Sequence, residues 1–286
     1  MKEAKFYKKL KNRIVQCELC PVNCVINDGQ RGNCHVRKNI SGKLYSMVYG
    51  RPSAVAIDPI EKKPLFHFLP ETRTYSIGTA GCNFNCMFCQ NYTLSQYNEE
   101  EIGYKELSPE RAVEEAQRNK CKSISYTYNE PTIFWEYVYD IAKITKRKGL
   151  KNIMITNGYI NLEPLKKLYP LIDAVNVDMK GNTEFYNKLC RGDIEIVKRN
   201  LIEIKKIGCH IEITNLLIPG YNDTDEEIED MASWILENLG KDTPLHLSRF
   251  FPLYKMAGLK ATPIATLERA KKIALNYLNK VYIGNI

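Results

Sequence analysis

Three cysteines lie within eight positions of the stretch CNFNCMFCQN, residues 82–91. Cys82, Cys86 and Cys89 form a C-x3-C-x2-C triplet, and closely spaced thiolates of this kind hold iron–sulfur clusters. Three protein ligands are one fewer than a closed four-ligand site needs, so one iron is left open for a substrate or cofactor. A zinc site completed by a distant histidine, or three buried thiols acting as small apolar groups, are the alternatives. The triplet favours an open iron–sulfur cluster.

The triplet follows the first of six short β-branched runs that alternate with helical stretches from about residue 74 onward. Gly149 and Gly208 mark the ends of two of the helices. Because parallel strands need a crossover connection, this order predicts an α/β fold, either an open doubly wound sheet or a partial (β/α) barrel. The six predicted strands are TYSIGT, SISYTY, NIMITN, AVNVDM, HIEITNLLI and PLHLSRF.

Polar and ionisable residues follow all six predicted strands. The runs end in GCNFNC, YNEPT, TNGY, DMKG, TNLLIPGYND and HLSRFFP. Barrel and open α/β enzymes assemble their active sites at the carboxyl ends of the strands. A single polar turn residue is common in any loop, but six consecutive strand ends that carry such residues, the first with the cysteine triplet, indicate one large site.

Length and composition fit one large α/β domain with a small appendage. The chain has 286 residues, 44% of them hydrophobic, and its net charge of +8 comes from 41 basic and 33 acidic side chains spread along the sequence. No segment approaches the roughly 20 apolar residues of a membrane span, so we expect a cytoplasmic protein without a membrane partner. The basic runs are typical of solvated helix faces, and we expect no nucleic-acid partner.

Residues 1–50 differ from the rest of the chain, and we call them the front module. They hold Cys17, Cys20, Cys24 and Cys34 and show no clear helical period. In a reducing compartment such cysteines are metal ligands rather than disulfides, and four of them suit a tetrahedral zinc site or a second cluster. Zinc is favoured because no catalytic-looking groups lie among the cysteines; an auxiliary cluster is the close alternative, and unligated thiols come third. Residues 51–286 form the second predicted domain.

The triplet, the aromatic residue before its third cysteine and its place after the first strand resemble the signature of the radical S-adenosylmethionine (SAM) superfamily. The resemblance implies a partial (β/α)6 TIM-like barrel and a [4Fe-4S] cluster whose open iron is chelated by SAM. Reductive cleavage of SAM then gives methionine and a 5′-deoxyadenosyl radical that abstracts hydrogen from a substrate. The cofactor supplies the chemistry and the protein orients it.

The same resemblance assigns cofactor contacts at the later strand ends. YNEP lies where the superfamily holds the methionine amino group, and TNG resembles a motif of the activases that generate glycyl radicals. Lys180 of DMK corresponds to the lysine that pairs with the methionine carboxylate, and His246 to a late histidine near the ribose. No residue is assigned to catalysis. The expected cofactor-binding residues are Phe88, Asn91, Asn129, Glu130, Thr156, Asp178, Lys180 and His246.

A narrower resemblance covers the flanking segments. YGRPSAVAIDPIEKKPLFHF before the triplet, SRFFP after the sixth strand and C-x2-C-P-x2-C in the front module are similar to the AmmeMemoRadiSam-system radical SAM enzymes, relatives of the pyruvate formate-lyase activating enzymes. This implies an oxidoreductase of the activating-enzyme type, with ferredoxin or flavodoxin as electron donor and a protein among the candidate substrates.

The alternative function class is a non-catalytic iron–sulfur or zinc protein used for electron transfer or scaffolding. An electron carrier normally closes its cluster with four cysteines and has no use for polar groups at six strand ends. The sequence therefore favours the enzyme.

Overall fold

The computed structural model describes residues 1–286, and its largest element is a sheet in the strand order β14-β13-β12-β11-β10-β9-β8-β7. Strands β8 to β14 are parallel, whereas β7 pairs with β8 in the antiparallel sense. The bounds are β7 (Ala54–Pro59), β8 (Arg73–Gly78), β9 (Ser123–Tyr126), β10 (Lys151–Thr156), β11 (Ala174–Asp178), β12 (His210–Leu217), β13 (Leu245–Arg249) and β14 (Val281–Gly284).

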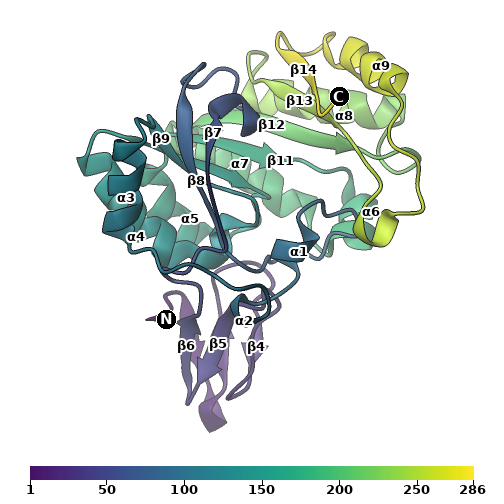
Figure 1. Ribbon diagram of the computed structural model, residues 1–286. Coiled ribbons are helices and arrows are strands. Elements are labelled where there is room, and N and C mark those ends of the chain that lie inside the picture. Colours follow the sequence, from purple (N-terminus) through teal and green to yellow (C-terminus); the bar gives the residue numbers. More distant parts are fainter.

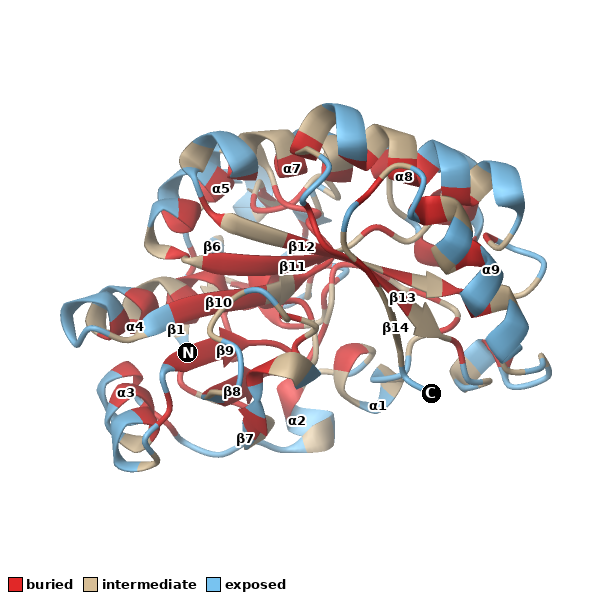
Figure 2. Ribbon diagram, turned by 90° about the horizontal axis from the view of Figure 1, so that it is seen from above, coloured by how far each residue is buried: buried red, intermediate tan, exposed pale blue.

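The sheet curves into a barrel that does not close, because β7 and β14 both remain edges. Seen from above, the longer helices form an arc on the outer side of the strands (Figure 2). A doubly wound sheet would carry helices on both faces, so the structure confirms the predicted α/β class and selects the partial barrel. All six predicted strands are present as β8 to β13.

Two strands of this sheet were missed. β14 has four residues close to the chain end, and β7 is an antiparallel edge strand in which only Asp58 is buried. Neither is followed by an α-helix, so the alternation that revealed the other strands does not extend to them.

The helices between the strands end where the local signals place them. Ser108 caps α3, Thr224 and Glu227 form a capping box at α8, and Gly208 ends α7 with a φ of 86°. The longer helices are α3 (Pro109–Arg118), α4 (Trp135–Arg147), α5 (Leu162–Leu168), α7 (Ile194–Ile207), α8 (Asp225–Leu239) and α9 (Ile264–Ala274).

Shorter helical segments lie mainly in the loops. The α-helical ones are α1 (Tyr92–Ser95), α2 (Glu99–Ile102) and α6 (Thr183–Phe185). The 3₁₀ segments are η1 (Lys11–Arg13), η2 (Ile60–Lys62), η3 (Pro131–Phe134), η4 (Tyr169–Leu171) and η6 (Tyr254–Met256), and η5 (Tyr186–Cys190) is a single π-helical turn.

The front module contains two small antiparallel sheets that lie below the barrel in Figure 1, against the loops at its carboxyl end. One has the order β1-β6-β5 and the other β2-β3-β4. Strands of two to four residues leave no readable alternation, which is why the sequence showed no period here. Their bounds are β1 (Lys2–Glu3), β2 (Tyr7–Lys9), β3 (Val15–Cys17), β4 (Val25–Ile26), β5 (Arg37–Ile40) and β6 (Lys43–Ser46).

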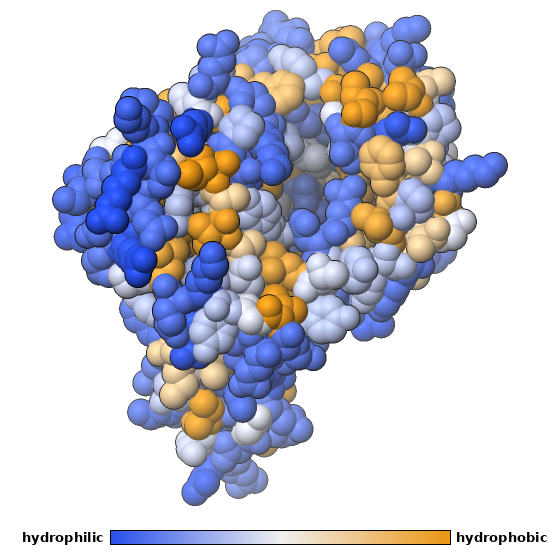
Figure 3. All heavy atoms as spheres, viewed as in Figure 1, coloured by the Kyte–Doolittle hydropathy of each residue, from blue (hydrophilic) through white to orange (hydrophobic).

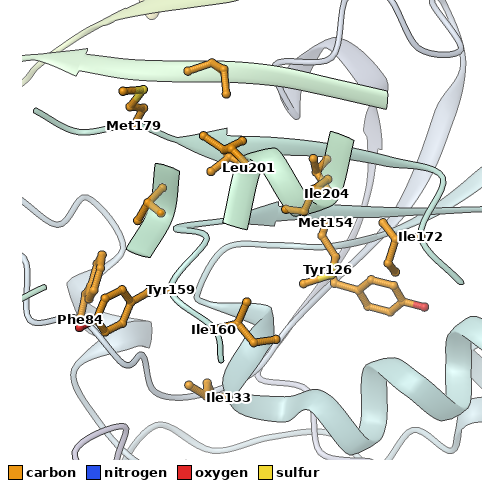
Figure 4. Packing of buried hydrophobic residues seen from close by; sticks show 14 of the residues in the cluster. Phe84, Tyr126, Ile133, Met154, Tyr159, Ile160, Ile172, Met179, Leu201 and Ile204 are labelled. Carbon is orange, nitrogen blue, oxygen red and sulfur yellow. The ribbon is translucent and has the colours of Figure 1, made fainter. Parts of the chain in front are cut away.

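One cluster of 65 buried hydrophobic residues extends from the front module into the barrel. Val15 and Leu44 belong to it, as do Trp135 of α4 and Tyr126 of β9. Close up, Phe84 of the first barrel loop lies beside the ring of Tyr159 (Figure 4), with 4.9 Å between the ring centroids. The front module and the barrel therefore share one core. None of the helices combines the length and hydropathy that a membrane-spanning segment needs.

Candidate functional site

The cysteine triplet lies in the loop that leaves the carboxyl end of β8, residues 79–91, which we call the Cys loop. Cys86 is buried, whereas Cys82 and Cys89 are partly exposed. The Phe84 N–H donates to Cys82 Sγ at 3.4 Å, and Ser95 Oγ lies 3.2 Å from Cys89 Sγ. No three ligand-type side chains converge closely enough to hold a single metal ion.

Two asparagines fix the Cys loop. Asn129 donates to the carbonyl of Gly81 at 2.8 Å and accepts from the Thr79 N–H at 3.1 Å. Asn83 donates to the Tyr159 carbonyl and accepts from Asn157 Nδ2, both at 2.8 Å. The loop between β8 and α1 is therefore held from the ends of β9 and β10 before any ligand binds.

The Cys loop is backed by the π-helical turn η5. The Asn85 and Met87 N–H groups donate to the carbonyls of Cys190 and Leu189, at 3.2 Å and 2.9 Å. Cys190 is fully buried, and its thiol hydrogen-bonds to Cys86. This bond lowers the pKa of Cys86 against the effect of burial, with a further lowering by the nearby ammonium of Lys180.

Lys180 is a largely buried cation beside the Cys loop. Its side chain is 13% exposed, and its Nζ lies 2.7 Å from Asp178 Oδ2 and 5.8 Å from the centroid of the Phe88 ring. Burial alone would lower the pKa of Lys180, but Asp178 and the Cys86 thiol raise it well above its usual range. The predicted pair of Asp178 and Lys180 is thus brought next to the thiols, with its ammonium charged.

Phe88 and Asn91 lie at the end of the Cys loop. Phe88 is buried, and its ring packs against Phe185 with 5.5 Å between centroids. Asn91 is exposed and donates through Nδ2 to the Tyr128 carbonyl at 2.8 Å. Phe88 therefore screens the thiols from water, while Asn91 ties the loop to the end of β9.

Glu130 and Thr156 join the ends of β9 and β10. Glu130 is 2% exposed and accepts hydrogen bonds from Thr156 Oγ1 and from the Asn157 N–H, both at 2.7 Å. Burial raises the pKa of Glu130. Both of its carboxylate oxygens are occupied by neighbouring groups of the protein, so in this structure Glu130 orders the strand ends rather than facing an open space.

His246 lies in the same cross-strand row as Asp178, with Thr214 between them. It is 4% exposed, its Nε2 is 2.7 Å from Glu212 Oε2, and its ring packs on Phe66 at 4.7 Å. Burial would raise the pKa of Glu212, but hydrogen bonds from histidines and backbone N–H groups lower it to about 2. His246 is therefore engaged by a carboxylate inside the barrel.

Sequence reasoning missed three of the residues that shape the site. Asn83 and Asn157 connect the Cys loop to the end of β10, and the clue was their place inside CNFNC and TNG. No sequence signal pointed to Glu212, because a glutamate in a strand is expected to face solvent. In this sheet it points into the barrel and is fully buried.

The surface seen in Figure 3 is hollowed between the β7 side and the β14 side of the molecule. This recess coincides with the open seam of the sheet, where neither edge strand has a partner. The carboxyl ends of the strands are thus reachable from the side.

A partial βα barrel whose carboxyl-end loops bring three thiols next to a largely buried cation has the arrangement of an enzyme that assembles its active site at the carboxyl end of a parallel sheet. Residues 76–235 match the model of the radical SAM superfamily, and the chain belongs to that superfamily.

Individual relatives agree with this assignment. An uncharacterised protein of Methanocaldococcus jannaschii is 48% identical over 287 residues, which cover 100% of this chain and 86% of that protein. A second protein of this organism carries the provisional name glycyl-radical enzyme activating enzyme; it is 30% identical over 71% of this chain and 77% of its own length. The predicted relationship to activating enzymes is confirmed.

A solved radical SAM methyltransferase from Sphaerobacter thermophilus has the same fold. Its TM-score is 0.58 at 17% identity, over 76% of this chain and 67% of that chain. The predicted TIM-like partial barrel is therefore confirmed.

The family implies SAM and a [4Fe-4S] cluster, and the residues at the site fit both. The three thiols would supply the soft ligands of the cluster, while Asp178 and Lys180 would supply charges for a zwitterionic ligand. The hydroxyl of Thr214, next to Asp178 in the sheet register, is buried and without a hydrogen-bond partner. An unpaired hydroxyl inside the barrel is suited to a polar ligand.

Proposed function

We propose that this radical SAM enzyme is an oxidoreductase that abstracts hydrogen from a protein substrate, in the manner of the glycyl-radical activases. When bound, the cluster and SAM supply a one-electron reductant and a 5′-deoxyadenosyl radical, with methionine as the other product. The observation that carries the proposal is the buried ammonium of Lys180 beside the Cys loop, next to its only carboxylate partner Asp178.

The Cys loop would hold the cluster through Cys82, Cys86 and Cys89. Phe84 and Phe88 are 2% and 4% exposed and keep water away from this side of the loop. Exclusion of water protects a reactive radical from side reactions and strengthens the local electrostatic interactions. Cys190, packed behind Cys86, adds a hydrogen bond to the sulfur of that ligand.

Lys180 would bind the methionine carboxylate of SAM. Its ammonium is already paired with Asp178, so the incoming carboxylate shares the cation or displaces the aspartate, which is 37% exposed on its side chain. Asp178 can then turn toward a positively charged amino group. The remaining contacts are proposed to come from Asn91, Asn129 and the ordered strand ends at Glu130 and Thr156.

His246 is proposed to reach the ribose only after its bond with Glu212 is rearranged. Its ring lies in the same row as Asp178, so its place in the sheet is compatible with a cofactor contact. The 2.7 Å pair with Glu212 competes with that contact. Of the expected SAM contacts, this is the one that the geometry favours least.

Two features support a protein substrate over a small molecule. The barrel is open between β7 and β14, and the recess in Figure 3 follows that seam, so an extended chain segment can enter from the side. The 30% identical relative is provisionally named as an enzyme that activates a glycyl-radical enzyme. The electron donor is proposed to be a ferredoxin or a flavodoxin.

The first experiment tests the cluster. Wild-type protein reconstituted without oxygen, incubated with SAM and dithionite, should form 5′-deoxyadenosine. Replacement of Cys82, Cys86 and Cys89 by Ala should remove about four irons per chain and abolish this product. The matched control is Cys121→Ala, which replaces a buried thiol outside the Cys loop. This variant should keep the wild-type iron content and should still form 5′-deoxyadenosine. Unchanged iron content in the triple variant would contradict the assignment.

The second experiment tests the substrate class. Extract of deuterated cells of the source organism is separated by size into a protein fraction and a small-molecule fraction, and each is incubated with enzyme, SAM and reductant. Hydrogen abstraction transfers deuterium into 5′-deoxyadenosine, which mass spectrometry detects. We expect transfer from the protein fraction. Transfer from the small-molecule fraction alone would show that the substrate is a metabolite.

A further inference from the structure

The four thiols of the front module line one pocket beneath the barrel. The wall also includes the apolar side chains of Leu19, Ile26 and Ile133, and it includes Asn83 of the Cys loop. Four cysteines that line one apolar space form a site rather than scattered core thiols. The cysteines are Cys17, Cys20, Cys24 and Cys34.

A backbone N–H group points at one of these sulfurs. The Asn33 N–H donates to Cys24 Sγ at 3.4 Å. The same arrangement occurs in the Cys loop, where the Phe84 N–H donates to Cys82 Sγ. Such donors stabilise negative charge on sulfur, as a metal-bound thiolate requires.

A buried arginine adds an unsatisfied donor. Arg37 lines the pocket, is 1% exposed and forms a bidentate pair with Glu136 at 2.9 Å and 3.0 Å. Its Nε–H has no partner. A buried donor without an acceptor is rare in folded proteins, and an anionic group in the pocket would supply the missing partner.

The spacing of the thiols favours a cluster over zinc. Zinc–sulfur bonds of about 2.3 Å in a tetrahedron place the sulfurs about 3.8 Å apart. In this structure no three of the thiols converge on one ion position, although all four line the same pocket. In a [4Fe-4S] cluster each thiolate binds a different iron, so the sulfurs stand farther apart. The sequence analysis favoured zinc because no catalytic-looking groups lie among the cysteines, whereas the arrangement of the thiols in the pocket favours the cluster.

The pocket adjoins the Cys loop directly. Asn33 Nδ2 donates to the Asn83 carbonyl at 3.1 Å, and Asn83 follows Cys82. A methyl group placed on Gly81 would collide with the Cys34 carbonyl, so these two backbones are in contact. One residue thus separates a ligand of the front site from a ligand of the core site.

Two buried ion pairs fix this arrangement. Arg31 forms a bidentate pair with Glu99 after the Cys loop, at 2.9 Å for both bonds, and Arg37 forms the one with Glu136 of α4. Glu99 and Glu136 are 1% and 2% exposed. Bidentate pairs of this kind fix orientation as well as distance. The two sites are therefore held at constant separation, which efficient electron transfer requires.

We propose that the front module holds a [4Fe-4S] cluster that relays electrons to the cluster of the Cys loop. A reduced ferredoxin or flavodoxin gives up one electron and is oxidised; the front cluster takes up that electron and passes it to the core cluster, returning to its oxidised state. No proton or bond is exchanged in the transfer. The relay rests on the proposed radical SAM function. The tests below distinguish failure of the relay from failure of that function.

The first test is metal analysis of the variant with Cys82, Cys86 and Cys89 replaced by Ala, reconstituted anaerobically with iron, sulfide and zinc. We expect about four irons and four sulfides per chain, held by the front module. About one zinc without iron, or no bound metal, would overturn the proposal. In reduced wild-type protein, the two paramagnetic clusters should broaden and split each other's electron paramagnetic resonance signals. Two independent signals would contradict their close approach.

The second test follows the route of the electron. In Cys24→Ala, the rate of core-cluster reduction by reduced ferredoxin, divided by the rate with dithionite, should fall at least tenfold relative to wild type. Cys209→Ala, at a buried thiol remote from the pocket, serves as the control. An unchanged ratio would refute the relay even if the front cluster exists. If Cys24→Ala does not fold, wild-type protein is mixed with reduced ferredoxin and rapidly frozen at successive times. The relay predicts that the paramagnetic signal of the front cluster appears before that of the core cluster, and the reverse order would refute it. Wild-type protein that makes no 5′-deoxyadenosine with dithionite would instead reject the radical SAM function itself.

Discussion

Lys180 is the side chain for which the proposed cofactor contact can be tested most directly. Its ammonium is buried beside the thiols and has one carboxylate partner, Asp178. A charge-assisted hydrogen bond in a shielded site contributes roughly 1.5–3 kcal/mol. Lys180→Ala should therefore weaken SAM binding by roughly 10- to 150-fold while the iron content stays constant, because Lys180 lies on a different strand end from the cluster ligands.

The measurement is a titration of SAM into the reduced protein. Lys180→Arg should recover part of the affinity, since a planar fork replaces a compact charge. Lys188→Ala is the matched control, because Lys188 is exposed and pairs only with Glu184 on the surface. Unaltered affinity in Lys180→Ala would reject the carboxylate contact without affecting the assignment of the Cys loop.

At the scale of elements, the position of the front module depends on the start of the Cys loop. Gly81 has a φ of 85°, and a Cβ there would meet the Cys34 carbonyl. Gly103 has a similar φ of 76°, but nothing lies within 4 Å of the corresponding Cβ position. Both glycines tolerate a left-handed backbone that other residues resist, and only one of them is in tight contact.

The pair Gly81→Ala and Gly103→Ala separates backbone strain from packing. Each substitution should lower the free energy of unfolding by about 1 kcal/mol because of backbone strain. Gly81→Ala should lower it by roughly a further 1–3 kcal/mol because the new methyl group overpacks the contact with Cys34. Urea unfolding of the two variants measures the difference. Equal losses in the free energy of unfolding would show that the front module can move away from Gly81 at no energetic cost. A mobile front module would also argue against a fixed distance for electron transfer.

At the scale of the whole molecule, a buried carboxylate connects the barrel interior to the segment before β8. Glu212 is fully buried and accepts hydrogen bonds from the Phe66 and His67 N–H groups at 3.1 Å and 2.8 Å. His210 and His246 contact its two oxygens at 3.0 Å and 2.7 Å. These bonds lower the pKa of Glu212 from 4.5 to about 2.

Because this pKa is lowered in the folded protein, Glu212 stabilises the fold above the pKa of the unfolded chain, and that contribution is lost as the pH falls toward 2. Each pKa unit corresponds to 1.36 kcal/mol, so the loss is about 3 kcal/mol. The free energy of unfolding of wild type minus that of Glu212→Gln should shrink by this amount between about pH 5 and pH 2. Urea titrations at several pH values measure it.

The control for this prediction is Glu229→Gln, at an exposed glutamate of α8. The free energy of unfolding of wild type minus that of Glu229→Gln should stay nearly constant over the same pH range. A constant difference for Glu212→Gln as well would contradict the lowered pKa of Glu212 in the folded protein.

The sequence by itself determined the order of the barrel and the identity of its thiols. β-branched runs alternating with capped helices are local features, and the spacing of Cys82, Cys86 and Cys89 lies within one loop. Capping residues such as Thr224 and Asp193 act within a few positions, so helix ends could be predicted. The family resemblance rests on the same local motifs.

Only the tertiary structure decided which distant groups meet. Cys190 behind Cys86, Glu212 beside His246 and the Cys34 carbonyl against Gly81 are contacts between residues far apart in the chain. Strand alternation does not say which face is buried when both faces carry polar residues, so the inward-facing Glu212 was not predictable. The short strands of the front module gain stability from the core that they share with the barrel, and their local sequence carries too little pattern to reveal them.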